Sequence, residues 1–208
     1  MSVTLRLRSL SFAAAVLSLA CAAHADYVWL ARDASGAASA HVGALGKAPQ
    51  PAASVAAPRA FLADGQDLPL TTEAERLVVA PAAAGDLRLV ASRVTDKGVL
   101  NYYQARFGRT ETKAVNDLEL VPTEPGGNSF KLFWKGNVVA ASQVNVDTSE
   151  GWRRVLAPAA DGSISLGTPF PGLYVLEVTA KVNGSVTVDG KKYEDVRHTA
   201  TLSFEVAR

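Results

Sequence analysis

The side chains best suited to metal chemistry in this sequence are two histidines far apart in the chain, His41 and His198. Neutral imidazole is a good ligand for nickel, cobalt and copper. Neither histidine has a second ligand at a local spacing such as His-x-His, so a site would have to be assembled from distant segments. His198 shares the strand parity of apolar Ala200, Leu202 and Phe204, which also predicts a core histidine, and we count it as a ligand only if it is exposed. His41 is also interpretable as a half-exposed strand residue.

The first 25 residues have the pattern of a secretory signal peptide. Arg6 and Arg8 form a basic start, an apolar run follows over 10–22, and Ala23-His24-Ala25 ends it with small residues at both positions that determine cleavage. The apolar run is shorter than the ~20 residues that a membrane-spanning helix needs. We therefore expect a cleaved, periplasmic protein that is not embedded in the membrane.

The position of the cut decides which group begins the mature chain. Cleavage after Ala25 exposes Asp26, whose amine and carboxylate form a weak, oxygen-rich chelate. Cleavage after Ala23 would instead expose His24, whose amine and imidazole together favour copper or nickel. With the later cut, the candidate metal ligands are Asp26, His41 and His198.

Composition excludes several kinds of chemistry. Removal of residues 1–25 discards the only cysteine, Cys21, and with it disulfides, thiol nucleophiles and thiolate metal sites. The remaining chain has 19 basic and 20 acidic residues and no basic patch, which argues against nucleic acid as a partner. It has no G-x-S-x-G, H-E-x-x-H or phosphate-binding glycine motif, so we expect no enzyme.

Three weaker sets of residues have both a functional and a structural interpretation. Asp117 and Glu119 fall on one face of a strand, which predicts a solvated strand face rather than a catalytic pair of carboxylates. The simplest interpretation of Trp134 and Trp152 is that they anchor the core of the sandwich. An aromatic and basic group could bind a sugar or an anion, or pack at a domain edge; it comprises Tyr102, Tyr103, Arg106 and Arg109.

The elements that must position these side chains are β-strands. In the N-terminal half, strands are expected over 27–30 with a hairpin partner at 39–43, over 77–80 and 87–91 as a second hairpin, and over 99–107. The Ala/Pro-rich segment 48–60 has no periodicity and predicts an extended surface loop. From Leu118 on, turn signals separate about seven short alternating strands, the last over 196–206, as in an antiparallel sandwich.

We therefore predict an all-β protein in three parts. These are the signal peptide 1–25, an N-terminal β domain over 26–113, and a C-terminal immunoglobulin- or transthyretin-like antiparallel β-sandwich over 114–208.

Several segments together resemble a known family. They are YYQARFGRTETKA at 102–114, DLELVP at 117–122, PGGN at 125–128, WKG at 134–136, GW at 151–152, PFPGLYVLEV at 169–178 and VRH at 196–198. The chain resembles a family of bacterial periplasmic proteins classed as a domain of unknown function (family 4198), often labelled periplasmic components of cobalt or nickel uptake systems. Many members begin their mature chain with His, whereas Asp26 stands at that place here.

The resemblance implies a β domain followed by a sandwich, and a role beside a membrane metal-transport complex. Our first functional hypothesis is a non-enzymatic accessory protein that binds nickel, cobalt or a related metal for uptake. The alternative is a metal-independent interaction module whose sandwich recognises a partner protein or a glycan.

Overall fold

The computed structural model describes residues 26–33, 35–80 and 85–207. Apart from one 3-10 turn, η1 (Ala52–Ser54), the regular elements in these ranges are strands, which confirms the predicted all-β sandwich class. The described part of the chain contains no helix long and apolar enough to cross a membrane. The predicted signal peptide, residues 1–25, lies outside the described residues.

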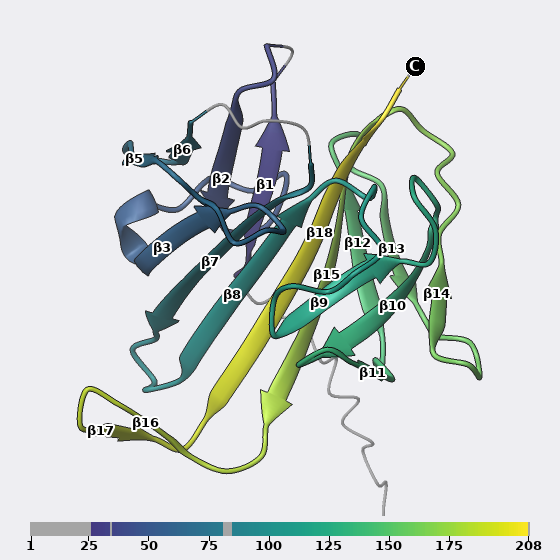
Figure 1. The fold of residues 1–208 in the computed structure, drawn as a ribbon. Helices are drawn as coiled ribbons and strands as arrows, with labels where there is room; N and C mark the ends of the chain where they lie inside the picture. The colour runs from purple at the N-terminus through teal and green to yellow at the C-terminus, as the bar shows by residue number, and fades with distance from the viewer. Residues whose placement is uncertain (1–25, 34, 81–84, 208) are drawn as a thin grey trace, which may run out of the picture.

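One eight-stranded sheet, which we call the shared sheet, extends across the molecule (Figure 1). In spatial order its strands are β13 (Arg153–Leu156), β12 (Val144–Thr148), β15 (Gly172–Val182), β18 (Val196–Val206), β8 (Leu100–Phe107), β7 (Leu87–Val94), β3 (Ala56–Phe61) and β4 (Asp67–Leu68). β8 and β18 are parallel, with Leu100 beside Val196, while the other neighbours are antiparallel. This parallel pair joins the N-terminal and C-terminal halves of the chain.

A four-stranded sheet packs on the N-terminal half of the shared sheet. This N-terminal cover consists of β1 (Val28–Arg32), β2 (Ala38–Val42), β6 (Leu77–Val79) and β5 (Leu70–Thr72). Its alternate residues, such as Leu30 and Leu77, are buried against Leu87, Leu89 and Tyr103 of β7 and β8. The expected hairpin of the first two strands is confirmed, with Trp29 opposite His41.

A second sheet packs on the C-terminal half. This C-terminal cover consists of β9 (Leu118–Pro122), β10 (Ser129–Trp134), β11 (Asn137–Val139) and β14 (Ser163–Ser165). Together with the shared sheet it encloses a core that includes Phe130, Leu176 and Leu202. The hydroxyl of Tyr174 donates to the carbonyl of Phe170 at 2.9 Å, the tyrosine corner that immunoglobulin-like sandwiches use.

The two covers lie on opposite faces of the shared sheet. Successive side chains of a strand point to opposite faces, and β18 is buried on both. Ala200 and Leu202 face the core under the C-terminal cover. Between them, Thr201 faces the other way and donates its hydroxyl to the carbonyl of Val28 in β1 at 2.7 Å. The molecule is therefore two sandwiches that use one sheet in common, one on each face.

A two-stranded hairpin extends beyond this body (Figure 1). It consists of β16 (Val186–Val188) and β17 (Lys191–Tyr193) and connects the far ends of β15 and β18. Asp189 and Gly190 at its tip both have positive φ, 49° and 76°, as a type I′ turn requires. We call residues 183–195 the hairpin arm.

Two expectations for the N-terminal half are wrong. The segment 48–60 is not a loop throughout, because Ala56–Phe61 forms β3 and pairs with β7. Pro58 lies within a register shift between Ala56 and Arg59, and such a bulge tolerates a residue without an N–H. The segments 77–80 and 87–91 do not form a hairpin: β6 pairs with β2 and β5, while β7 belongs to the shared sheet.

Candidate functional site

His41 lies on the outer part of the N-terminal cover. Its ring stacks on that of Trp29 at a centroid distance of 4.4 Å, and its Nε2 lies 2.9 Å from the hydroxyl of Ser39. Partial burial lowers the pKa of His41, and the charge of Arg76 lowers it further. Both effects favour the neutral imidazole, the form that binds a metal. It borders a hollow of about 440 Å³ whose other lining residues are Pro49, Glu73, Ala74, Glu75 and Arg76.

His198 lies inside the molecule rather than at its surface. It is only 8% exposed. Its ring packs between Tyr102 and the edge of Trp134, at centroid distances of 4.9 and 4.7 Å. Its Nδ1 lies 3.4 Å from Oε1 of Gln104. Burial lowers the pKa of His198. Because His198 is not exposed, it does not meet the condition for a metal ligand. The interpretation as a core histidine fits instead.

The structure does not bring Asp26, His41 and His198 together. The exposed carboxylate of Asp26 lies 3.6 Å from the guanidinium of Arg93. The ring of His198 contacts Trp134 of the C-terminal cover. His41 belongs to the N-terminal cover, which lies on the opposite face of the shared sheet. Within the described ranges, no three His, Cys, Asp or Glu side chains gather in a group suited to a metal ion. The predicted three-residue metal site therefore does not fit this geometry.

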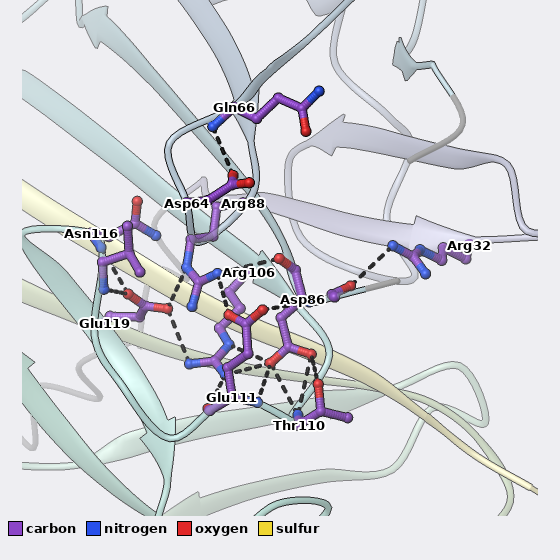
Figure 2. Close-up of polar contacts among 12 residues, drawn as sticks. Arg32, Asp64, Gln66, Asp86, Arg88, Arg106, Thr110, Glu111, Asn116 and Glu119 are labelled. Atoms are coloured by element: carbon purple, nitrogen blue, oxygen red, sulfur yellow. Dashed lines mark hydrogen bonds and ion pairs between the residues drawn. The ribbon is translucent and has the colours of Figure 1, made fainter. Parts of the chain in front are cut away.

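The densest group of charges is a buried cluster where the chain passes from one half to the other (Figure 2). Arg88 of β7 and Arg106 of β8 are directly paired across the strands, and both are fully buried. Glu119 reaches between them from β9, with Oε1 at 3.0 Å from Arg88 and 3.1 Å from Arg106. Asp86 pairs with Arg106, and Glu111 lies 2.7 Å from Arg88. We call these five residues the ion cluster.

The carboxylates of the ion cluster also fix the connecting segment 110–116. Asp86 accepts hydrogen bonds from the backbone N–H groups of Thr110 and Glu111, at distances of 3.0 Å. The second oxygen of Glu119 accepts from the N–H groups of Val115 and Asn116, at 2.6 and 2.8 Å. With its charges paired and its centre closed to solvent, the cluster is suited to holding the two halves together rather than to catalysis.

The ion cluster corrects one prediction from the sequence and decides between two interpretations of another group. Glu119 is 1% exposed, so the solvated face predicted for Asp117 and Glu119 is wrong for the glutamate. Arg106 and Tyr103 are also buried, so of the two interpretations of the aromatic and basic group, packing fits the structure and a sugar- or anion-binding surface does not. Arg109 instead packs over the ring of Phe204 at 4.3 Å. The sequence contained a signal of the buried charges: Arg88 stands between Leu87 and Leu89 in the otherwise apolar run 87–91.

The open edge of the shared sheet is a surface that the sequence did not single out. In an antiparallel pair of strands, residues that exchange backbone hydrogen bonds alternate with residues that do not. Thr148 donates its N–H to the carbonyl of Trp152 at 3.0 Å, so this pair is a hydrogen-bonded one and fixes the alternation along β12 and β13. By that alternation, the backbone groups of Arg154 and Leu156 face β12, while those of Arg153 and Val155 face outward. Val155 is 62% exposed. In the described part of the chain, no strand pairs with this side of β13.

A groove runs beside this open edge. It measures about 520 Å³ and lies between β13 and the segment after β14; its lining includes Trp152, Arg154, Leu156, Leu166 and Pro169. The guanidinium of Arg154 lies 5.6 Å from the centre of the Trp152 ring. We call this the edge groove. It combines apolar side chains, one cation and a free backbone edge.

In comparisons with known proteins, no family model matches this chain and no curated protein matches it. The choice between functions therefore depends on the geometry described above.

Proposed function

We propose that this protein is a non-enzymatic interaction module of the periplasm, which binds an extended segment of a partner protein along the open edge of β13. The observation that carries the proposal is the free edge itself, formed by the outward backbone groups of Arg153 and Val155. An added strand would gain main-chain hydrogen bonds, and its alternate side chains would enter the edge groove. Main-chain pairing favours a protein partner over a glycan.

The charges of β13 favour an acidic partner over a second copy of the chain. Arg153 already pairs with Asp147 at 2.9 Å, so Arg154 is the uncompensated cation of β13. Pairing two β13 strands would bring the Arg154 residues of both copies together, and like charges on neighbouring strands destabilise their pairing. Arg154 lies in the edge groove beside apolar Trp152 and Leu156. A strand that alternates apolar and acidic side chains complements this arrangement.

A photo-crosslinking amino acid at exposed Ala157, directly after β13, tests this function in periplasmic extract treated with a metal chelator. We expect a specific adduct that the same probe at Asp64, in the other half, does not give. Val155→Pro removes one outward N–H and leaves the β12–β13 ladder intact, so it should reduce the adduct at least about tenfold. Val155→Thr keeps that N–H and should not. An adduct that Val155→Pro leaves unchanged would refute edge binding.

Transition-metal handling beside a membrane metal-transport complex is the second candidate. One observation favours it: His41, Glu73 and Glu75 line the same hollow, although the three side chains do not form a ready-made metal-binding group. Arg76 competes for this hollow, because its Nε lies 2.7 Å from the carboxylate of Glu73. A metal bound here would depend on His41 and not on His198.

Calorimetric titration of the protein beginning at Asp26 with nickel, cobalt and copper tests this second candidate. We expect His41→Ala to weaken binding at least about tenfold and His198→Phe to leave it unchanged. Direct metal capture is excluded if none of the three ions binds more tightly than about 1 mM.

A further inference from the structure

The strand β15 extends past its neighbour β12 and leaves part of one edge unpaired. The last registered pair of the two strands joins Asn145 to Glu177, whereas β15 continues to Val182. In the described part of the chain, no other strand pairs with this side of β15. The side chains of β15 are buried over 173–178 and Thr179 is exposed, which agrees with an open edge.

Thr179 and Lys181 direct their backbone groups to this unpaired edge. On the side of β15 where β12 lies, the carbonyl of Leu173 accepts a hydrogen bond from the N–H of Ser149 at 2.9 Å. The backbone groups of successive residues turn to the two sides of a strand alternately, so every second residue after Leu173 faces this side. Thr179 and Lys181 therefore present N–H and C=O groups that an added strand can pair with.

An apolar cavity opens beside this edge. This end cavity measures about 490 Å³ and lies between the two sheets of the C-terminal sandwich, with Val178 and Ala180 on one wall and Leu132 and Trp134 on the other. Ala180 takes the inward position of β15 after Leu176 and Val178. A large apolar side chain that an added strand placed beside Ala180 would enter this space and gain both packing contacts and hydrophobic free energy.

The opposite face of the same edge carries an excess of positive charge. Side chains alternate between the faces of a strand, so Lys181 points away from the end cavity and lies beside Arg197 of β18. Arg197 contacts both carboxylate oxygens of Asp195 at 3.2 and 3.1 Å, and the ammonium of Lys181 lies 3.5 Å from one of them. Two cations thus share one carboxylate, and an acidic side chain opposite Lys181 would balance the second.

We propose that the unpaired edge of β15 binds an extended peptide, which pairs with Thr179 and Lys181 and inserts a large apolar side chain into the end cavity beside Ala180. An acidic side chain of the peptide lies opposite Lys181, on the other face. Main-chain pairing supplies the affinity and the cavity selects the apolar side chain. The end cavity and the edge groove share no lining residue, so this is a second site, independent of the partner in the preceding section.

The capped peptide acetyl-Thr-Glu-Phe-Thr-Thr-amide tests the proposal by calorimetry and amide hydrogen exchange, with its Glu opposite Lys181 and its Phe opposite Ala180. In the free protein the amides of Thr179 and Lys181 should exchange rapidly, and that of Ala180, which faces β18, slowly. The peptide should slow exchange at Thr179 and Lys181 at least about tenfold. Binding weaker than about 1 mM, or binding without this protection, would overturn the site. Protection that rises with protein concentration in the absence of peptide would show a second copy at this edge instead.

Modified peptides separate main-chain pairing from apolar contact. N-methylation of the Thr after Phe removes an N–H that faces β15 and should weaken binding at least about tenfold. N-methylation of the Phe, whose N–H faces away, should have little effect. Replacement of the Phe by Ala should also weaken binding at least about tenfold. Equal effects of the two N-methyl groups would contradict main-chain pairing.

Protein variants test each part of the site. Lys181→Pro removes one N–H of the edge and leaves the β15–β18 ladder intact, so it should abolish binding, whereas Lys181→Gln should weaken it less than about fivefold. Ala180→Leu should block the cavity, and the matched Ala63→Leu, at an exposed alanine in the other half, should not. Val155→Pro should leave peptide binding unchanged, and a loss there would place the peptide at β13. The exchange pattern of the wild-type protein remains decisive if a variant does not fold.

Discussion

Arg88 and Arg106 occupy directly opposite positions on β7 and β8, where two cations repel each other. They remain there because Glu119, from another sheet, places one carboxylate oxygen within 3.1 Å of both guanidinium groups. The glutamate also accepts two backbone hydrogen bonds with its second oxygen. Glu119 therefore bridges the two guanidinium groups, which Asp86 and Glu111 also pair with individually, and fixes the segment that enters β9.

We expect Glu119→Gln to lower the free energy of unfolding by about 3 kcal/mol or more, because it leaves two buried arginines without their shared anion. Urea denaturation measures this. The neighbouring Asp117→Asn, at an exposed position, should change stability by less than about 0.5 kcal/mol. Similar losses for the two variants would show that the ion cluster does not hold the two halves together.

His198 should make stability depend on pH. Burial lowers its pKa in the folded state below the ordinary value near 6.5, so the unfolded chain takes up the proton first. The stabilising contribution of neutral His198 is complete above pH ~6.5 and falls as the pH drops towards the folded-state pKa. We expect an NMR titration midpoint below 6.5, and a smaller loss of stability between pH 7 and 5 in His198→Phe. A midpoint at or above 6.5 would contradict this prediction.

At the scale of elements, local periodicity predicted single strands well and their partners less well. The span 196–206 of β18 and the buried parity of His198 followed from alternation alone. The parallel partner of β18 is β8, far away in the chain, and both strands are buried on both faces, so no local pattern indicates the pairing. The solvated face predicted for Glu119 is wrong for a related reason. Alternation shows which side of a strand is polar, but not whether another part of the fold covers that side.

The hairpin arm should be dispensable for folding. An isolated two-stranded hairpin contributes little stability in water, and residues 186–188 and 191–193 contribute to neither core. Replacement of residues 183–195 by Asn-Gly, which suits a two-residue turn between Val182 and Val196, should change the free energy of unfolding by about 1 kcal/mol or less. Denaturation midpoints measure this. A loss of several kcal/mol would show that the arm packs on the body in solution.

At the scale of the whole molecule, the shared sheet should make the two sandwiches unfold together. The N-terminal core includes Tyr103 and Ala105 of β8, the C-terminal core includes Ala200 and Leu202 of β18, and the two strands pair along eight residues. Fluorescence of Trp29→Phe reports on the C-terminal half, and that of a variant with Trp134→Phe and Trp152→Phe reports on the N-terminal half. In each variant the urea midpoint should coincide with that of circular dichroism. Separate midpoints would show two independent domains instead.

The central place of β18 also has a consequence for the order of events in the cell. A chain is made from its amino end, so β18 emerges after the other strands that the structure describes. Until it arrives, β15 and β8 each have an exposed edge, and the core beneath the C-terminal cover lacks Ala200, Leu202 and Phe204. The C-terminal core therefore cannot be completed before β18 has been made.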